Sequence, residues 1–221
     1  MKPRVLILYF SFSNQTRRVA EAMGESFREL DWDVDQCDIE FIDHRYHIEM
    51  PFRPVGRKLL RWLLPQAFGK TGDVRVREEV LAKEYDLICI GSPTWWFNPA
   101  MPIVSFLKSP AAGKLLDGKR FAVFTVCRKA WWNNMRNVKK LARKQGGTFV
   151  DGAAFCFQGS DLRSALSFIS YMENDANLER FWGLKIYEFG VPAEGIARAK
   201  EFARELAAGL QTPDDSASKS D

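Results

Sequence analysis

The sequence predicts a doubly wound α/β fold, in which helices cover both faces of a five-stranded parallel sheet of order 2-1-3-4-5. Three observations support this prediction. Five apolar runs rich in β-branched or aromatic residues recur along the chain, and most of them are continuously apolar, as strands buried on both faces are. Helical patterns with one apolar face lie between these runs. The chain has 221 residues, 46% of them hydrophobic, and is long enough to bury such a core without disulfides or a metal.

The expected elements alternate along the chain. Strands are expected at residues 5–10, 34–41, 87–90, 121–126 and 149–157. Helices are expected at residues 16–30, 101–107, 134–144 and 193–210. In the first helix Val19, Met23 and Phe27 recur at helical spacing. Pro192 stands at the start of the last helix, where its fixed φ is favourable.

Two connections are longer than a single helix requires. Residues 43–84 contain the basic amphipathic segment 56–70 (GRKLLRWLLPQAFGK), and residues 158–191 are rich in aromatic side chains. Long connections in compact domains often carry function. We therefore expect one domain over residues 1–210 with two long insertions, followed by a disordered Ser- and Asp-rich tail at 211–221.

The composition excludes several functional classes. The net charge of +4, from 32 Lys and Arg against 28 Asp and Glu, excludes a polycation and a strongly acidic chain. The four cysteines are dispersed and form no CxxC pair, which argues against a disulfide framework or a metal site and for a reducing cytoplasm. The apolar run near the N-terminus is too short for a signal peptide or a membrane span. His44 and His47 have the i, i+3 spacing of metal ligands but lack an evident third ligand, so no metal is expected.

The candidate site begins with the loop after the first strand, since ligands of open parallel sheets bind at the carboxyl ends of the strands. Hydroxyl and amide side chains gather there at Ser11, Ser13, Asn14, Gln15 and Thr16. A helix N-terminus favours an anion through its free N–H groups and its dipole. The loop is therefore either a phosphate site or an ordinary N-cap with polar neighbours. No GxGxxG or Walker A sequence is present, which disfavours those nucleotide cradles.

Two further loops, after the third and fourth strands, carry adjacent tryptophans. The first consists of Pro93, Thr94, Trp95, Trp96, Phe97 and Asn98. Consecutive aromatic side chains at a strand end predict a rigid platform for a planar ligand, or a plug under the next helix. The second contains Cys127, Arg128, Lys129, Trp131 and Trp132, which places an aromatic pair beside two cations. Two platforms and a phosphate loop match a planar ring tethered to a monophosphate, such as flavin mononucleotide (FMN).

These loops resemble the motifs of flavodoxin-fold FMN proteins, and the likeness extends over most of the chain. Residues 11–16 (SFSNQT) resemble the T/S-x-T/S-G-N-T phosphate loop. Residues 91–94, with Asn98 and then Phe106 and Leu107, resemble the G-T/S-P-T…N…F-L stretch of the NAD(P)H:quinone reductase branch. The resemblance implies that residues 11–16 hold the FMN phosphate and that 93–98 and 127–132 flank its isoalloxazine. Residues 96–135 also resemble flavodoxin-like proteins associated with dialkylresorcinol biosynthesis.

The chain departs from the family pattern at three positions. Asn14 and Gln15 replace Gly-Asn, and Asn tolerates the left-handed conformation better than most residues do. Phe97 stands where the reductases often have Gly. In flavodoxins a glycine peptide beside the flavin flips to stabilise its one-electron form. Phe97, together with the net charge of +4, therefore disfavours an acidic one-electron carrier.

Basic residues are concentrated late in the chain, with nine cations and no acid between residues 119 and 144. We interpret residues 139–144 as a solvated helix face. Arg128 and Lys129 are expected to bind a cofactor phosphate, a nicotinamide dinucleotide phosphate or an anionic substrate, or to stabilise the charge of reduced flavin. Nucleic-acid binding is disfavoured, because no known binding motif accompanies the cations. Segment 56–70 is interpreted as a cover for the sheet edge or a homodimer contact, in preference to a membrane-surface helix.

The sequence therefore predicts an FMN-binding oxidoreductase. It would pass electrons from a reduced nicotinamide, NAD(P)H, or a protein donor through the flavin to a quinone or another aromatic acceptor. No side chain is assigned as an acid or a base. Two alternatives stay open: a one-electron carrier for a protein partner, and a flavin-free accessory protein of aromatic lipid or polyketide synthesis. In the second, residues 158–191 would cover a hydrophobic pocket.

Overall fold

The central sheet of the computed structural model has the order β2-β1-β5-β7-β8, which is 2-1-3-4-5 in chain order. Its parallel strands are β1 (Arg4–Tyr9), β2 (Asp33–Asp38), β5 (Leu87–Trp95), β7 (Arg120–Cys127) and β8 (Thr148–Cys156). The predicted fold class and strand order are thus confirmed. The structure describes residues 2–46, 49–53, 55, 64–159 and 161–211.

The first strand shows why the apolar runs are continuous. Val5 and Ile7 belong to the core on one side of the sheet, and Leu6 and Leu8 belong to the core on the other side. All four side chains are fully buried. Successive side chains of a strand point to opposite faces. A strand covered on both faces therefore needs an apolar residue at every position.

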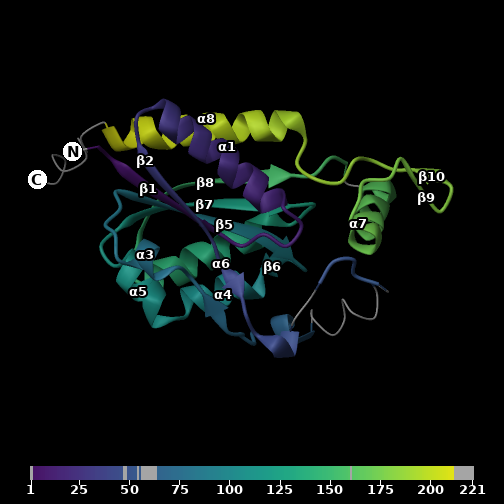
Figure 1. The fold of residues 1–221 in the computed structure, drawn as a ribbon, viewed down its shortest axis with the longest axis horizontal. Helices are drawn as coiled ribbons and strands as arrows, with labels where there is room; N and C mark the ends of the chain where they lie inside the picture. The colour runs from purple at the N-terminus through teal and green to yellow at the C-terminus, as the bar shows by residue number, and fades with distance from the viewer. Residues whose placement is uncertain (1, 47–48, 54, 56–63, 160, 212–221) are drawn as a thin grey trace, which may run out of the picture.

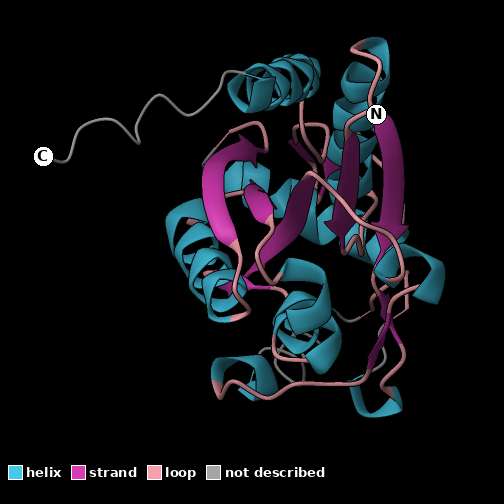
Figure 2. Ribbon diagram, turned by 90° about the vertical axis from the view of Figure 1, so that its left-hand side faces the viewer, coloured by secondary structure: helices cyan, strands magenta, loops and turns pink. Residues whose placement is uncertain are grey.

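Helices form a layer on each face of the sheet. On one face lie α1 (Gln15–Glu29) and α8 (Ala193–Gln211), and on the other lie α3 (Glu78–Leu81), α4 (Met101–Leu107), α5 (Pro110–Leu116) and α6 (Trp131–Lys144) (Figure 1). The perpendicular view shows the strands between the two layers (Figure 2). Helices α1, α4 and α8 begin within one residue of the predicted positions. Helix α6 begins three residues earlier than predicted, which changes the place of its first tryptophans.

The first insertion forms a small hairpin-like unit beside the sheet. It contains η1 (His44–Tyr46) and β4 (Val74–Arg75), and β4 pairs antiparallel with β3 (Glu40–Phe41), which lies just before the insertion. The buried Asp43 carboxylate accepts hydrogen bonds from the Arg45 guanidinium and from the backbone N–H of Asp73 (3.1 Å). The Arg45 guanidinium holds the pKa of Asp43 well below its usual range. Residues 56–63, most of the basic segment, and His47 lie outside the described residues.

The second insertion contains a helix that the sequence analysis did not predict. Helix α7 (Leu162–Asn174) is followed by the hairpin of β9 (Arg180–Phe181) and β10 (Leu184–Lys185). Its start signal is Asp161, whose carboxylate accepts the backbone N–H of Ser164 (3.2 Å) as an N-cap. Figure 1 shows α7 and this hairpin beyond the carboxyl ends of the strands, at the opposite end from the two termini.

Two further predictions concern the C-terminal tail and membrane-spanning helices. The predicted disordered tail lies outside the described residues from residue 212 onward. In the described part of the chain, no helix combines the length and the apolar character that crossing a bilayer would require.

Candidate functional site at the carboxyl end of the sheet

A cavity of about 340 Å³ lies where β1, β5 and β7 end. This is the switch point of the sheet, because the chain leaves β1 toward β2 on one side and leaves β5 toward β7 on the other. The cavity is lined by most of the residues that the sequence predicted: Ser13, Gln15, Thr16, Pro93, Thr94, Trp95, Trp96, Phe97, Cys127, Arg128 and Lys129. The fold thus brings three loops that are far apart in the sequence to one place.

The loop between β1 and α1 supplies the polar end of the cavity. Asn14 takes the left-handed conformation (φ 59°) as the N-cap of α1, and its side chain makes no capping hydrogen bond. The Ser11 hydroxyl instead accepts the backbone N–H of Arg17 (3.2 Å). Ser13 and Thr16 both line the cavity, and the first N–H groups of a helix have no partner within it. This end of the cavity is suited to an anion.

Gln15 fastens this loop to the chain that enters α8. It is buried, and its Oε1 accepts hydrogen bonds from the backbone N–H of Val191 (3.1 Å) and from the Arg18 guanidinium (2.9 Å). Gly190, at φ 129°, approaches so closely that a Cβ there would lie 2.3 Å from the same oxygen. Only glycine fits this approach. Gln15 therefore braces the loop, whatever it also contributes to a ligand.

The turn between β5 and β6 (Asn98–Pro99) forms the exposed part of the aromatic wall. These strands pair antiparallel, with Trp95 opposite Asn98, so Trp96 and Phe97 make a two-residue turn. Both have left-handed backbones, with φ of 46° and 67°. Such turns normally use Asn or Gly, and bulky residues there carry backbone strain. Their side chains are 62% and 55% exposed at the cavity.

Trp95 forms the more deeply packed part of the same wall. Its ring lies edge-on to Phe10 and Phe12, with centroids 5.4 and 6.4 Å away. Its backbone carbonyl accepts a hydrogen bond from the Gln66 side chain (2.7 Å), which comes from the first insertion. The ring is therefore held in place by both its neighbours and its backbone.

The loop between β7 and α6 supplies the cations. Arg128 is half-buried and Lys129 is exposed, and both line the cavity. No acidic side chain is among the described residues that line it. The local field of this wall is therefore positive, which favours a phosphate or a negatively charged ring.

The structure places Trp131 and Trp132 elsewhere than the sequence analysis expected. Ala130 adopts a left-handed backbone (φ 63°) and α6 begins directly after it. Trp131 and Trp132 thus occupy the first turn of α6, where they are 42% and 60% exposed and do not line the cavity. Trp131 contributes its backbone N–H, which hydrogen bonds to the Cys127 sulfur.

Three other predicted residues are likewise absent from the cavity wall. Ser11 and Asn14 shape the loop before α1, as described above. Asn98 holds the β5–β6 turn to α6, since its Oδ1 accepts a hydrogen bond from the Asn133 amide (3.0 Å). The buried Asn134 adds a second link, because its amide donates to the Thr94 hydroxyl (2.8 Å).

Most of the apolar wall was missed by the sequence analysis. The additional lining residues are Phe12, Phe52, Val55, Val126, Ala130, Phe157, Phe168, Met172 and Phe189. The two insertions meet here, and the backbone N–H of Phe52 donates to the carbonyl of Met172 (2.6 Å). The aromatic richness of residues 158–191 was a signal for part of this wall. Nothing in the local sequence marked Phe52 or Val55.

Comparisons with known proteins agree on the architecture. No protein-family model matches the chain, and no curated protein matches it. Among solved structures, a flavodoxin from the domain Archaea is 14% identical, with a TM-score of 0.53 over 95% of this chain and 99% of the other. Flavodoxin 2 from Bacillus cereus is 18% identical, with a TM-score of 0.53 over 93% and 99%. A flavoprotein from Lactobacillus acidophilus, in complex with FMN, is 21% identical, with a TM-score of 0.52 over 69% and 93%.

The chain has the flavodoxin fold.

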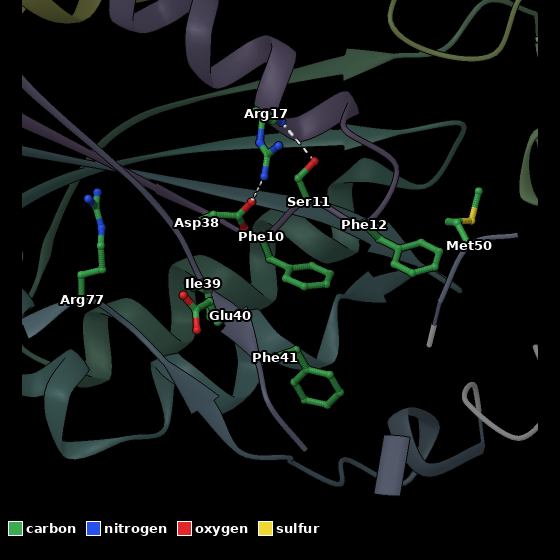
Figure 3. A pocket seen from close by; sticks show the side chains of 10 residues that line it. All are labelled: Phe10, Ser11, Phe12, Arg17, Asp38, Ile39, Glu40, Phe41, Met50 and Arg77. Atoms are coloured by element: carbon green, nitrogen blue, oxygen red, sulfur yellow. Dashed lines mark hydrogen bonds and ion pairs between the residues drawn. The ribbon is translucent and has the colours of Figure 1, made fainter. Parts of the chain in front are cut away.

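A second cavity, of about 700 Å³, lies on the β2 side of the loop between β1 and α1. Figure 3 shows its lining, in which the Arg17 guanidinium pairs with the Asp38 carboxylate (2.8 Å). Burial raises the pKa of Asp38, against the opposing effect of Arg17. Phe12 lines both cavities. The smaller cavity is the better candidate site, because it alone of the two lies at the switch point.

Proposed function

We propose that the cavity at the switch point binds FMN and that the protein is a flavin-dependent oxidoreductase. The observation that supports this most is the union, in one cavity, of a helix N-terminus flanked by hydroxyls with a wall of aromatic rings. The solved neighbours agree, since they include flavodoxins and a flavoprotein in complex with FMN. Electrons would pass from a reduced nicotinamide or a protein donor to a quinone or another aromatic acceptor.

The residues present fit the two ends of FMN. The phosphate would lie at the start of α1, held by the first-turn N–H groups and by the hydroxyls of Ser13 and Thr16. The isoalloxazine would lie against Trp95, with Trp96 and Phe97 at its outer edge. FMN supplies hydride and electron transfer when bound.

The chain's own groups orient the cofactor and exclude water. Arg128 and Lys129 would stabilise negative charge on the ring or on a substrate, because no Asp or Glu is among the described lining residues to form an ion pair with them. Phe168, Met172 and Phe189 would close the apolar side of the cavity. That apolar surface favours an aromatic acceptor over a small polar one.

The test is the absorbance spectrum of freshly purified protein, followed by titration of the apoprotein with FMN while flavin fluorescence is measured. We expect one FMN per chain with quenched fluorescence. Riboflavin, which lacks the phosphate, is the matched control and should bind at least roughly tenfold more weakly, because charge-assisted hydrogen bonds to the phosphate are lost. The proposal is overturned if neither FMN nor riboflavin binds.

Turnover then decides between donors and acceptors. Oxidation of NADH or NADPH with a quinone present is expected for the oxidoreductase. A carrier would instead show no steady turnover and a distinct one-electron stage during stepwise reduction.

A flavin-free function is the second candidate, and the apolar wall favours it. Phe52, Val55 and Phe157 extend the cavity with surface that a planar cofactor does not require. On this alternative the cavity binds a long-chain aromatic molecule. Stoichiometric retention of FMN through purification would count against it.

A further inference from the structure

Cys127 and Cys156 are the last residues of two neighbouring strands, β7 and β8, and they lie side by side. They are partners in the strand register, and their sulfur atoms are 3.6 Å apart. Cys127 is buried and lines the switch-point cavity, whereas Cys156 is exposed. Cys37 and Cys89 are both buried and lie on other strands. The described structure therefore contains one pair of adjacent thiols, with one member open to solvent.

The backbone spacing suits a covalent bond between them. Neighbouring strands are about 4.8 Å apart, which is within the range of Cα separations that a disulfide spans. The sulfur atoms need to approach to about 2.05 Å, and side-chain rotation supplies most of that movement. We propose that Cys127 and Cys156 form a thiol–disulfide exchange site for low-molecular-weight disulfides, with Cys156 as the attacking thiol and Cys127 as the resolving thiol.

Cys156 is the attacking thiol because it is exposed and activated. A hydrogen bond from the Cys127 thiol lowers the pKa of Cys156 to about 7. A thiol with that pKa is about half deprotonated at pH 7, and the thiolate is the nucleophile. An incoming disulfide can reach Cys156 without any opening of the sheet.

Cys127 is suited to the second step. While Cys156 carries a negative charge, their hydrogen bond raises the pKa of Cys127, and burial raises it further. Once Cys156 is bonded to an incoming sulfur, that charge is gone. The Thr94 side chain and the backbone N–H of Trp131, which hydrogen bond to the Cys127 sulfur, then favour its thiolate.

The chemistry balances without a further reactant. The Cys156 thiolate attacks a disulfide RSSR, so that a Cys156–SR bond forms and RS⁻ leaves. Cys127 loses its proton to solvent and attacks the Cys156 sulfur, so that the Cys127–Cys156 bond forms and the second RS⁻ leaves. The two protein thiols are oxidised by two electrons, and RSSR is reduced to two thiols. The product disulfide would lie on the cavity wall, but its formation does not depend on FMN.

The experiment uses the full chain, reduced and then freed of reductant, with glutathione disulfide as the probe. We expect a fast product that is lighter by two hydrogen atoms, with the peptides of Cys127 and Cys156 cross-linked in the digest. Cys127→Ala should stop at a glutathione adduct on Cys156. Cys156→Ala should leave Cys127 unmodified, because that thiol is buried. Cys89→Ala is the matched control and should form the cross-link at the wild-type rate.

The pH dependence of the reaction rate at Cys156 is a second test, because a folding defect would not produce the expected profile. With a pKa of about 7 at Cys156, the rate of the first attack on glutathione disulfide in the wild-type chain should rise roughly tenfold between pH 6 and pH 8, whereas the thiolate fraction of an unperturbed thiol rises about 75-fold. In Cys127→Ala the hydrogen bond that lowers the pKa of Cys156 is absent, so the rate of adduct formation should rise more steeply over the same interval. Thermal unfolding of each variant shows whether it is folded. A stable wild-type adduct without a cross-link, or labelling of Cys37 and Cys89 at the same rate as Cys156, would overturn the proposal.

Discussion

The two adjacent tryptophan pairs, Trp95-Trp96 and Trp131-Trp132, have similar local sequences but occupy different environments in the structure. Each lies at or just after the carboxyl end of a strand of the sheet, and each is preceded by a short polar or basic stretch. The first pair spans the end of β5 and its turn, and lines the cavity. The second pair occupies the first turn of α6 and faces solvent. A tryptophan at a strand end is thus not by itself a ligand platform. The turn that follows the strand decides where its ring points.

The largest expected effect is on the free energy of unfolding, and it distinguishes Trp95, the packed member of the first pair, from the exposed Trp132 of the second pair. Trp95→Ala should lower the free energy of unfolding by about 3 kcal/mol, because the ring packs edge-on to Phe10 and Phe12. Trp132→Ala should change it by less than about 0.5 kcal/mol, since its ring is largely exposed. Urea unfolding of the two apoproteins measures both. Equal losses would remove the distinction between the pairs.

The next effect concerns FMN affinity rather than stability. Trp96→Ala should weaken FMN binding by about tenfold, through loss of an aromatic contact worth roughly 1 kcal/mol or more. Trp131→Ala keeps the backbone N–H that contacts Cys127 and should leave the affinity unchanged. Fluorescence titration compares them. A loss of affinity in Trp131→Ala alone would show that the second pair is the platform.

A third test addresses the strain at the tip of the first pair. Phe97→Gly places glycine at φ 67° and should stabilise the apoprotein by about 0.5 kcal/mol, because the left-handed strain of a bulky residue exceeds the cost of added flexibility in the unfolded chain and little buried surface is lost. Phe97→Ala keeps the left-handed penalty and is the matched control. If glycine destabilises as much as alanine does, the turn is not strained and the phenyl ring packs more firmly than its exposure indicates.

The smallest effect is expected where the second pair begins. Ala130→Gly removes the penalty of a left-handed alanine (φ 63°) but adds flexibility to the unfolded chain. These terms nearly cancel, so we expect a change of less than about 0.5 kcal/mol in thermal or urea unfolding. A stabilisation as large as that of Phe97→Gly would show that both turns are equally strained and that the difference between the pairs lies in their side chains alone.

Local patterns predicted much of the fold and of the polar end of the site. The apolar runs located all five core strands, and the helical spacing of α1, α4 and α8 located their starts. The left-handed tolerance of Asn14 was expected and is observed at φ 59°. Helix α7 was missed, because its aromatic residues obscured a start that Asp161 marks through its cap.

The sequence by itself determined the order of the sheet and the three loops that converge at its carboxyl end. Both follow from short-range periodicity and from the general rule that parallel strands end at one edge. Only the tertiary structure decided which tryptophans line the cavity and what closes its far side. Phe52 and Met172 meet there from insertions that are far apart in the chain. Contacts between distant segments leave no repeating pattern in either segment, so local sequence does not reveal them.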